Sequence, residues 1–130
     1  MDHAALMRSY FAAYNSEDEE HLAPLLANDV ILVSAAGEQR GREAYLATYR
    51  WMIAHFIDRM TPEHIVADAE GALVDIDDKL TARADIADFL GRPVQAGQAL
   101  TLTLKGRYTI QNGCISRIEI RPRASKIGLV

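Results

Sequence analysis

One aspartate stands apart from the other titratable side chains, because its neighbours place it on an apolar face. Over residues 74–82 every second side chain is mostly apolar, and Asp78 falls on the same side as Ile76 and Leu80. A carboxyl group that faces an apolar cavity has a raised pKa and can serve as an acid or a base. Asp78 is therefore the first catalytic candidate. The alternative is a bulge or turn that directs Asp78 to solvent.

Two tyrosines on a predicted helix supply hydroxyl groups. Leu6, Met7, Tyr10, Phe11 and Tyr14 recur at helical spacing and form one apolar stripe, which ends near Asn15. A tyrosine on such a stripe either donates a hydrogen bond to a ligand or satisfies its hydroxyl within the core. We take Tyr10 as a second catalytic candidate and Tyr14 as a ligand-binding candidate.

Metal and cofactor chemistry is not expected. The four histidines have no metal-ligand spacing, and the glycines form no phosphate-binding loop. The single cysteine, Cys114, has no partner for a disulfide. We expect neither a metal nor a cofactor.

Composition limits the class of protein further. The chain has 130 residues, a formal net charge of −4 and no dense basic stripe, which argues against nucleic-acid binding. No apolar run is long enough to cross a membrane, and the first residues do not resemble an export signal. We expect one domain over residues 1–130, located in the cytoplasm.

The spacing of apolar residues predicts helices first and a sheet afterwards. A second helix is expected from Glu17, after a capping box of Ser16 and Glu19, with an interruption at Pro24. A short buried strand follows at residues 30–33, and then a polar loop at residues 37–41. A third helix is predicted from residue 42 to about 57, stopped by Thr61-Pro62.

The second half of the chain alternates between apolar and polar residues, as strands do. Strands are expected around residues 74–84 and 100–110, and Asn112-Gly113 predicts a hairpin into a last strand with Ile118 and Ile120 facing inward. Residues 85–90 are predicted to form a short helix or a lid-like turn. A sheet with one apolar face needs a cover, so the fold class is α+β, with three N-terminal helices packed on a curved, mostly antiparallel sheet.

Three stretches, YFAAYNSEDEEHLAPLLANDVIL, GREAYLATYR and RYTIQNGCISRIEI, give the chain a family resemblance. The sequence resembles the nuclear-transport-factor-2-like (cystatin-like α+β) superfamily, in particular its SnoaL-like and ketosteroid-isomerase-like branches. The resemblance implies a cone-shaped pocket between the sheet and the helices. It does not by itself imply an activity, because this fold hosts enzymes of several kinds and non-enzymatic domains.

The catalytic residues of ketosteroid isomerases are matched only in part. Tyr10 matches the tyrosine of the oxyanion hole, and Tyr49 matches a supporting tyrosine. The base position falls on Ser34, and the acidic oxyanion donor falls on Gly106 or Lys105, none of which is a carboxylic acid. The segment FLGRPVQAGQ resembles a turn of the SnoaL-type cyclases, but the last strand offers no inward carboxylate. Neither standard mechanism is therefore expected.

The resulting prediction is a domain that binds a small hydrophobic ligand in its cone, with acid–base chemistry of the isomerase, cyclase or hydrolase type resting on Asp78 and Tyr10. The alternative is a non-catalytic binding or dimerisation domain of the same fold. Asp58 lies near the predicted helix end and is expected at most at the mouth of the cavity. The expected ligand-binding residues are Tyr14, Tyr49, Trp51, Phe56, Leu102 and Tyr108.

Charged residues of both signs lie on the other face of the predicted strands, for example Asp75, Lys105 and Glu119. A mixed-sign surface can pack against a second copy of itself across a two-fold axis. Together with the habit of the resembled superfamily, this predicts a homodimer through the outer face of the sheet.

Overall fold

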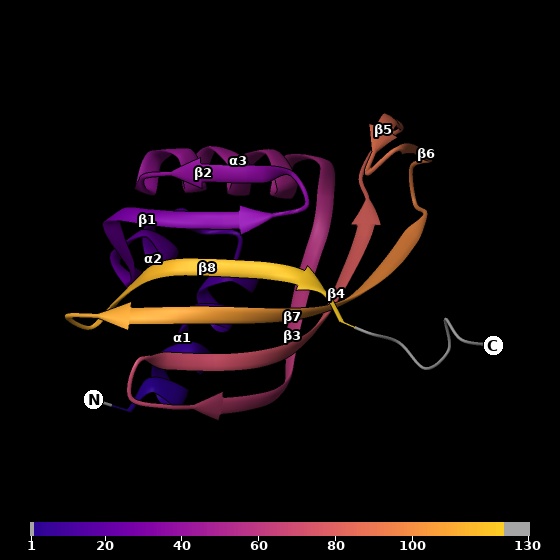
Figure 1. Ribbon diagram of the computed structural model, residues 1–130. Coiled ribbons are helices and arrows are strands. Elements are labelled where there is room, and N and C mark those ends of the chain that lie inside the picture. Colours follow the sequence, from indigo (N-terminus) through magenta and orange to yellow (C-terminus); the bar gives the residue numbers. More distant parts are fainter. Residues whose placement is uncertain (1, 124–130) are drawn as a thin grey trace.

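The computed structural model describes residues 2–123, in which helices cover one face of a curved sheet (Figure 1). The elements in chain order are α1 (His3–Asn15), α2 (Glu19–Leu22), the 3₁₀ helix η1 (Ala23–Leu25), β1 (Leu26–Ser34), β2 (Gly37–Arg40), α3 (Arg42–His55), β3 (Phe56–Ala67), β4 (Gly71–Ala82), β5 (Ile86–Phe89), β6 (Arg92–Val94), β7 (Ala99–Gln111) and β8 (Cys114–Pro122).

The main sheet has six strands in the order β2-β1-β8-β7-β4-β3, and only the pair β1 and β8 is parallel. The α+β class and the mostly antiparallel sheet are therefore confirmed. The core lies between the sheet and helices α1 and α3, with Met7, Val74 and Ile118 among its fully buried side chains. None of the described helices is long and apolar enough to span a membrane.

The start of the second helix differs from the prediction. Helix α2 begins at Glu19, and Asp18 caps it by accepting the N–H of Glu20. Ser16 instead donates its hydroxyl to the carbonyl of Ala13. The predicted Ser16–Glu19 capping box is therefore wrong, because Glu17 has a left-handed φ of 60° that a helix cannot contain.

Pro24 interrupts this helix as predicted, since the chain changes from α2 to the 3₁₀ helix η1 at Ala23. The predicted polar loop at residues 37–41 is wrong. Gly37–Arg40 forms the edge strand β2, which pairs with β1 across a two-residue turn between Ser34 and Gly37. Its side chains are polar because this edge strand is largely exposed to solvent.

The third helix ends two residues early, and this changes the site. Helix α3 stops at His55, and Phe56 opens strand β3, which continues through Thr61 and Pro62. Pro62 was expected to stop a helix, but it lies in an edge strand beside a bulge, where a missing N–H costs little. Asp58 is consequently a strand residue.

The segment at residues 85–90 forms neither a short helix nor an isolated turn. Strands β5 and β6 make a separate two-stranded hairpin that projects beside one end of the main sheet (Figure 1). Phe89 of this hairpin packs on Phe56, with 4.7 Å between the ring centroids. The hairpin thus belongs to a second, smaller core.

The alternation predicted for the long strands is confirmed. Along β4 the side chains of Val74, Ile76, Asp78 and Leu80 are all buried. The hairpin between β7 and β8 turns at Asn112 and Gly113, both with positive φ as this turn requires. Ile118 of β8 is buried, which confirms its predicted inward direction.

Candidate active site

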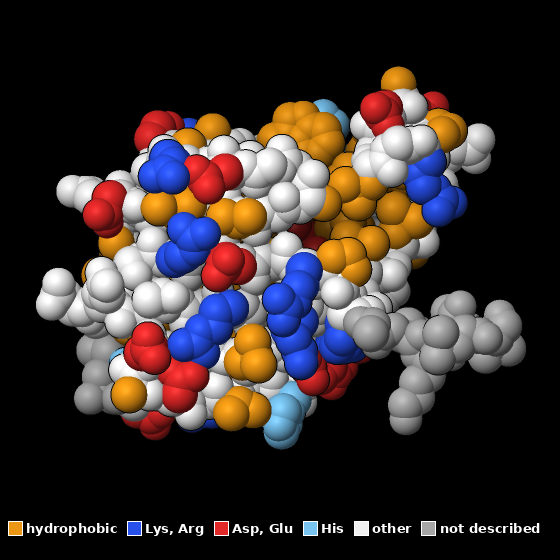
Figure 2. Space-filling model, viewed as in Figure 1, with side chains coloured by type: hydrophobic (Ala, Val, Ile, Leu, Met, Phe, Trp, Pro, Cys, Tyr) orange, Lys and Arg blue, Asp and Glu red, His pale blue; other side chains and the backbone are white. Residues whose placement is uncertain are grey.

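A cavity of about 450 Å³ lies between the concave face of the sheet and the helices. Its lining is mostly apolar, and all five tyrosines of the chain contribute to it. The turn after β1 and the tip of the β5–β6 hairpin also contribute, through Ala36 and Leu90. Figure 2 shows hydrophobic side chains gathered beside this hairpin.

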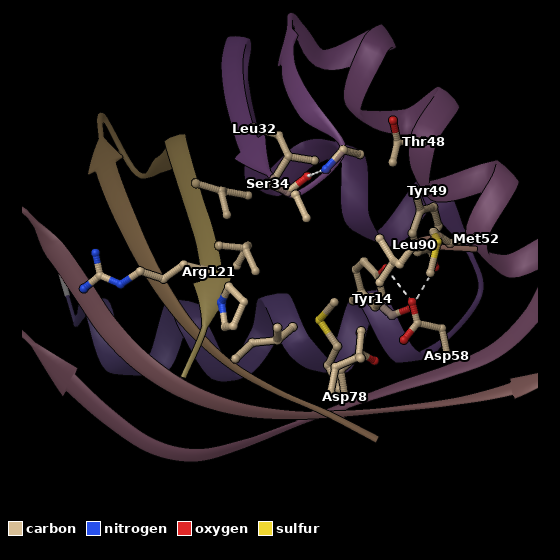
Figure 3. Close-up of a pocket in the computed structure, with 18 of the residues that line it drawn as sticks. Tyr14, Leu32, Ser34, Thr48, Tyr49, Met52, Asp58, Asp78, Leu90 and Arg121 are labelled. Carbon is tan, nitrogen blue, oxygen red and sulfur yellow. Dashed lines mark hydrogen bonds between the residues drawn. The ribbon is translucent and has the colours of Figure 1, made fainter. Parts of the chain in front are cut away.

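Two aspartates face the cavity from neighbouring strands. Asp58 of β3 lies opposite Leu80 of β4, and Met60 lies opposite Asp78. Asp58 and Asp78 are therefore diagonal neighbours on the same face of the sheet. Both side chains are buried, with 0% and 3% of the residue exposed, and both line the cavity. Figure 3 shows them at one end of the cavity, below Tyr49 and Met52.

Tyr14 holds one of the two carboxyl groups, and each carboxyl group keeps one oxygen without a partner among residues 2–123. The hydroxyl of Tyr14 donates to Oδ2 of Asp58 at 2.7 Å. The Oδ1 atoms of Asp58 and Asp78 are buried and have no hydrogen-bond partner among the described residues. Two neighbouring buried carboxyl groups repel each other when both are charged, which favours the protonated form of one of them.

Asp78 is the carboxyl group that this environment keeps protonated. Burial raises the pKa of the Asp78 carboxyl well above its ordinary value, and the nearby Asp58 carboxyl raises it further. At neutral pH Asp78 is therefore protonated and can donate a hydrogen bond. The Tyr14 hydroxyl holds Asp58 in place beside it, in a mostly apolar cavity.

A cluster of three tyrosine hydroxyls forms a second polar region. Tyr10 and Tyr45 are hydrogen-bonded through their hydroxyls at 2.5 Å, and the Tyr108 ring packs on Tyr10, with 5.5 Å between the ring centroids. Burial raises the pKa of all three hydroxyls above the ordinary value, so they are neutral hydrogen-bond donors. Gly106 makes room for this arrangement, because a Cβ atom there would lie 2.6 Å from the Tyr108 ring.

Most of the predicted site residues line the cavity. Asp78, Tyr10, Tyr14, Tyr49, Leu102 and Tyr108 are all in its lining. Their roles in catalysis or binding stay predictions. Ser34, at the position of the isomerase base, also lines the cavity, but its hydroxyl accepts the N–H of Ala36.

Trp51 and Phe56 lie outside the lining, contrary to the prediction. Trp51 is 41% exposed and stacks on His55, with ring centroids 4.1 Å apart. Phe56 is fully buried against Phe89 in the second core. Trp51 lies in α3, as expected, but on its exposed side, where it also stacks near Phe89. Phe56 faces inward at the start of β3, but it packs into the second core and not along the cavity.

Asp58 is fully buried in the cavity lining, whereas the sequence analysis placed it only at the cavity mouth. Its strand was not predicted, so its inward direction was not recognised. The signal that could have revealed it is the two-residue alternation of Phe56, Asp58 and Met60, which all face inward.

Within residues 2–123, no group of three or more histidine, cysteine or acidic residues is arranged to hold a metal ion. The outer face of the sheet carries mixed charges, as Figure 2 shows. Its ion pairs include Asp75 with Lys105 and Asp68 with Arg107. The side chain of Arg121 also points away from the cavity (Figure 3).

Comparisons with known proteins agree with this architecture. A family model described as a SnoaL-like domain matches residues 7–118. A comparison with curated proteins gives no match.

Three solved structures illustrate the fold relationship. A proposed polyketide cyclase of Pseudomonas putida KT2440 is 25% identical, with a TM-score of 0.81 and coverage of 95% of this chain and 92% of that one. A proposed polyketide cyclase of Silicibacter sp. TM1040 is 21% identical, with a TM-score of 0.80 and coverage of 96% and 91%. An NTF2-like protein of unknown function from Burkholderia pseudomallei K96243 is 18% identical, with a TM-score of 0.75 and coverage of 95% and 92%.

Proposed function

The chain belongs to the SnoaL-like domain family, and we propose that it binds a small, largely apolar molecule in its cavity and transfers a proton on that molecule through Asp58 and Asp78. The observation that carries this proposal is the buried pair of Asp58 and Asp78 in the cavity, whose Oδ1 atoms have no hydrogen-bond partner among the described residues. An acid and a base at the same point of an apolar cavity suit proton abstraction next to a carbonyl group.

The proposed reaction uses a protonated Asp78 and an unprotonated Asp58. Asp58 accepts a proton from the carbon next to a substrate carbonyl, and the electron pair of that C–H bond moves to form an enolate. Asp78 donates a hydrogen bond to the developing negative charge, which an anionic carboxylate could not do. Return of the proton from Asp58 to a different carbon gives an isomer. Attack of the enolate carbon on a second carbonyl of the same molecule instead closes a ring, and the alkoxide formed from that carbonyl takes back the proton that Asp58 removed. Either outcome conserves all the atoms of the substrate and restores both carboxyl groups.

The descriptions of two structural neighbours favour ring closure over isomerisation. Both are proposed polyketide cyclases. Polyketide-like molecules carry several carbonyl groups and acidic C–H bonds. A mostly apolar cavity of about 450 Å³, lined by five tyrosine rings, is suited to a flat, oxygen-bearing molecule of this class.

The test is an exchange assay in D₂O with a neutral aromatic β-keto ester as the probe. We expect the wild-type protein to accelerate exchange of the acidic C–H above the buffer rate, and both Asp58→Asn and Asp78→Asn to lose about 100-fold or more of that acceleration. Asp88→Asn, in the exposed hairpin, is the matched control and should retain it.

Two results would contradict the proposal. If the probe binds in the cavity but its exchange is not accelerated, the protein is a non-catalytic binding domain. If Asp58→Asn and Asp78→Asn exchange the probe as fast as the control, the acceleration comes from other groups.

A further inference from the structure

Strand β3, which carries Asp58, is one of the two edge strands of the sheet. Among residues 2–123 it pairs with β4 alone, and its pairing is irregular between Pro62 and His64. An edge strand with a bulge is held less firmly than a central strand. The position of Asp58 therefore depends on what contacts the outer edge of β3.

The side chain of Asn15 makes that contact. Its Nδ2 donates to the carbonyl of Met60 at 2.8 Å, and its Oδ1 accepts the N–H of Met60 at 2.8 Å. One side-chain amide thus satisfies both backbone groups of a single residue, as a neighbouring strand would. Together the two hydrogen bonds restrain Met60 from sliding along the strand direction and from rotating about the strand axis.

The location of this contact links it to the carboxyl pair. Met60 lies directly opposite Asp78 and two residues after Asp58. Tyr14, next to Asn15 on α1, donates its hydroxyl to Asp58. Two consecutive residues at the end of α1 therefore hold the side chain of Asp58 and the backbone beside it. A slip of β3 by one residue would turn Asp58 to the opposite face of the sheet.

Two further polar contacts lie near this end of β3. Arg83 donates to the carbonyl of Phe56 at 3.1 Å, at the first residue of the strand. Arg59 pairs with Glu17 at 3.3 Å, but their side chains are 47% and 30% exposed, and such ion pairs contribute little to stability, about 0–1 kcal/mol. The amide of Asn15 differs from both, because it binds the N–H and the carbonyl of the residue opposite Asp78.

We propose that Asn15 is a positioning residue for the carboxyl pair, which holds Asp58 next to Asp78 through the backbone of Met60. It does not touch the cavity contents itself, since it is absent from the cavity lining. The inference rests on the proposed function in one respect, because the carboxyl pair that Asn15 positions is the proposed acid and base. Its test measures the titration of the Asp78 carboxyl and needs no substrate.

The experiment is a pH titration of aspartate carboxyl carbons by ¹³C NMR, in which the Asp78 signal is identified from its loss in Asp78→Asn. Asn15→Leu removes both hydrogen bonds to Met60 and keeps a similar volume. We expect its Asp78 midpoint to fall by at least one pH unit, because Asp58 moves away and water reaches the pair.

The matched control is Asp68→Ala, at the other end of β3. Asp68 accepts the N–H groups of Glu70 and Gly71 and so holds the turn between β3 and β4. We expect this variant to lower the melting temperature while leaving the Asp78 midpoint unchanged. If Asn15→Leu does not fold, Asn15→Ala replaces it with the same expectation.

Each result separates the two proposals. An ordinary Asp78 midpoint near pH 4 in the wild-type protein would contradict the proposed function itself. A raised wild-type midpoint that Asn15→Leu leaves unchanged, or that Asp68→Ala lowers equally, would overturn only the role of Asn15. Loss of folding in both Asn15 variants would also overturn it, because Asn15 would then be a purely structural residue.

Discussion

Asp58 and Asp78 are diagonal neighbours across strands β3 and β4, and both face the cavity from positions with at most 3% exposure. The diagonal arrangement places the two carboxyl groups beside each other on the cavity side of the sheet and keeps them out of bulk water. The consequence is a protonated Asp78 at neutral pH. This single relationship determines both the chemistry and the pH dependence expected of the protein.

The stability of the protein should depend on pH through Asp78. In the unfolded chain its carboxyl releases a proton above about pH 4, whereas in the folded protein its pKa is raised and the proton stays. The free energy of unfolding therefore falls with rising pH above about 4, by at most about 1.4 kcal/mol per pH unit from this group.

Urea denaturation between pH 5 and 8 measures this effect. The stability difference between wild type and Asp78→Asn should decrease steadily across this range, because asparagine does not titrate. Parallel curves for the two proteins would mean that Asp78 titrates normally in the folded state.

Removal of the Tyr14 hydroxyl should impair the acid–base pair. Tyr14→Phe leaves Oδ2 of Asp58 without its donor, at a cost of about 1–3 kcal/mol in stability. We expect exchange of the β-keto ester probe to slow at least about tenfold. Asp88→Asn, in the exposed hairpin, is the control, because it leaves the cavity tyrosines unchanged. Equal rates in the two variants would exclude a specific role for the Tyr14 hydroxyl.

Filling the cavity should block binding without unfolding the protein. Leu102 lines the cavity and lies opposite Asp78 on the neighbouring strand. Leu102→Trp should weaken binding of a neutral fluorescent naphthylamine at least tenfold. Val66→Trp, at a position 49% exposed and outside the lining, should bind the probe like the wild type. Unchanged affinity in Leu102→Trp would place the binding site elsewhere.

The homodimer through the outer sheet face stays a prediction. Its support is the mixed charge on that face, where the ion pairs of Lys105 with Asp75 and of Arg107 with Asp68 lie. Light scattering at micromolar concentration should give twice the chain mass of 14.4 kDa. A Lys105→Glu variant should shift the mass toward that of the monomer, and a monomeric wild-type protein would contradict the dimer.

Much of the fold could be predicted because the apolar pattern is regular where one face of an element is buried. Helix α1 and strand β4 show this most clearly, and the inward direction of Asp78 followed from its place in the β4 alternation. Strands β2 and β3 were missed because both are edge strands. Strand β2 carries no apolar side chain, and β3 contains Pro62, which a strand tolerates only at an edge.

The sequence by itself determined the α+β class and the family, since these depend on local periodicity and motifs. It placed Asp78 on the apolar side of its strand, and the structure decided that no bulge turns it to solvent. Only the tertiary structure decided that Asp58 lies beside Asp78, because this depends on where α3 ends and on the register between two strands that local patterns do not specify. The raised pKa of Asp78 is a property of that burial and register, because two carboxyl groups change each other's ionisation only when the fold brings them together.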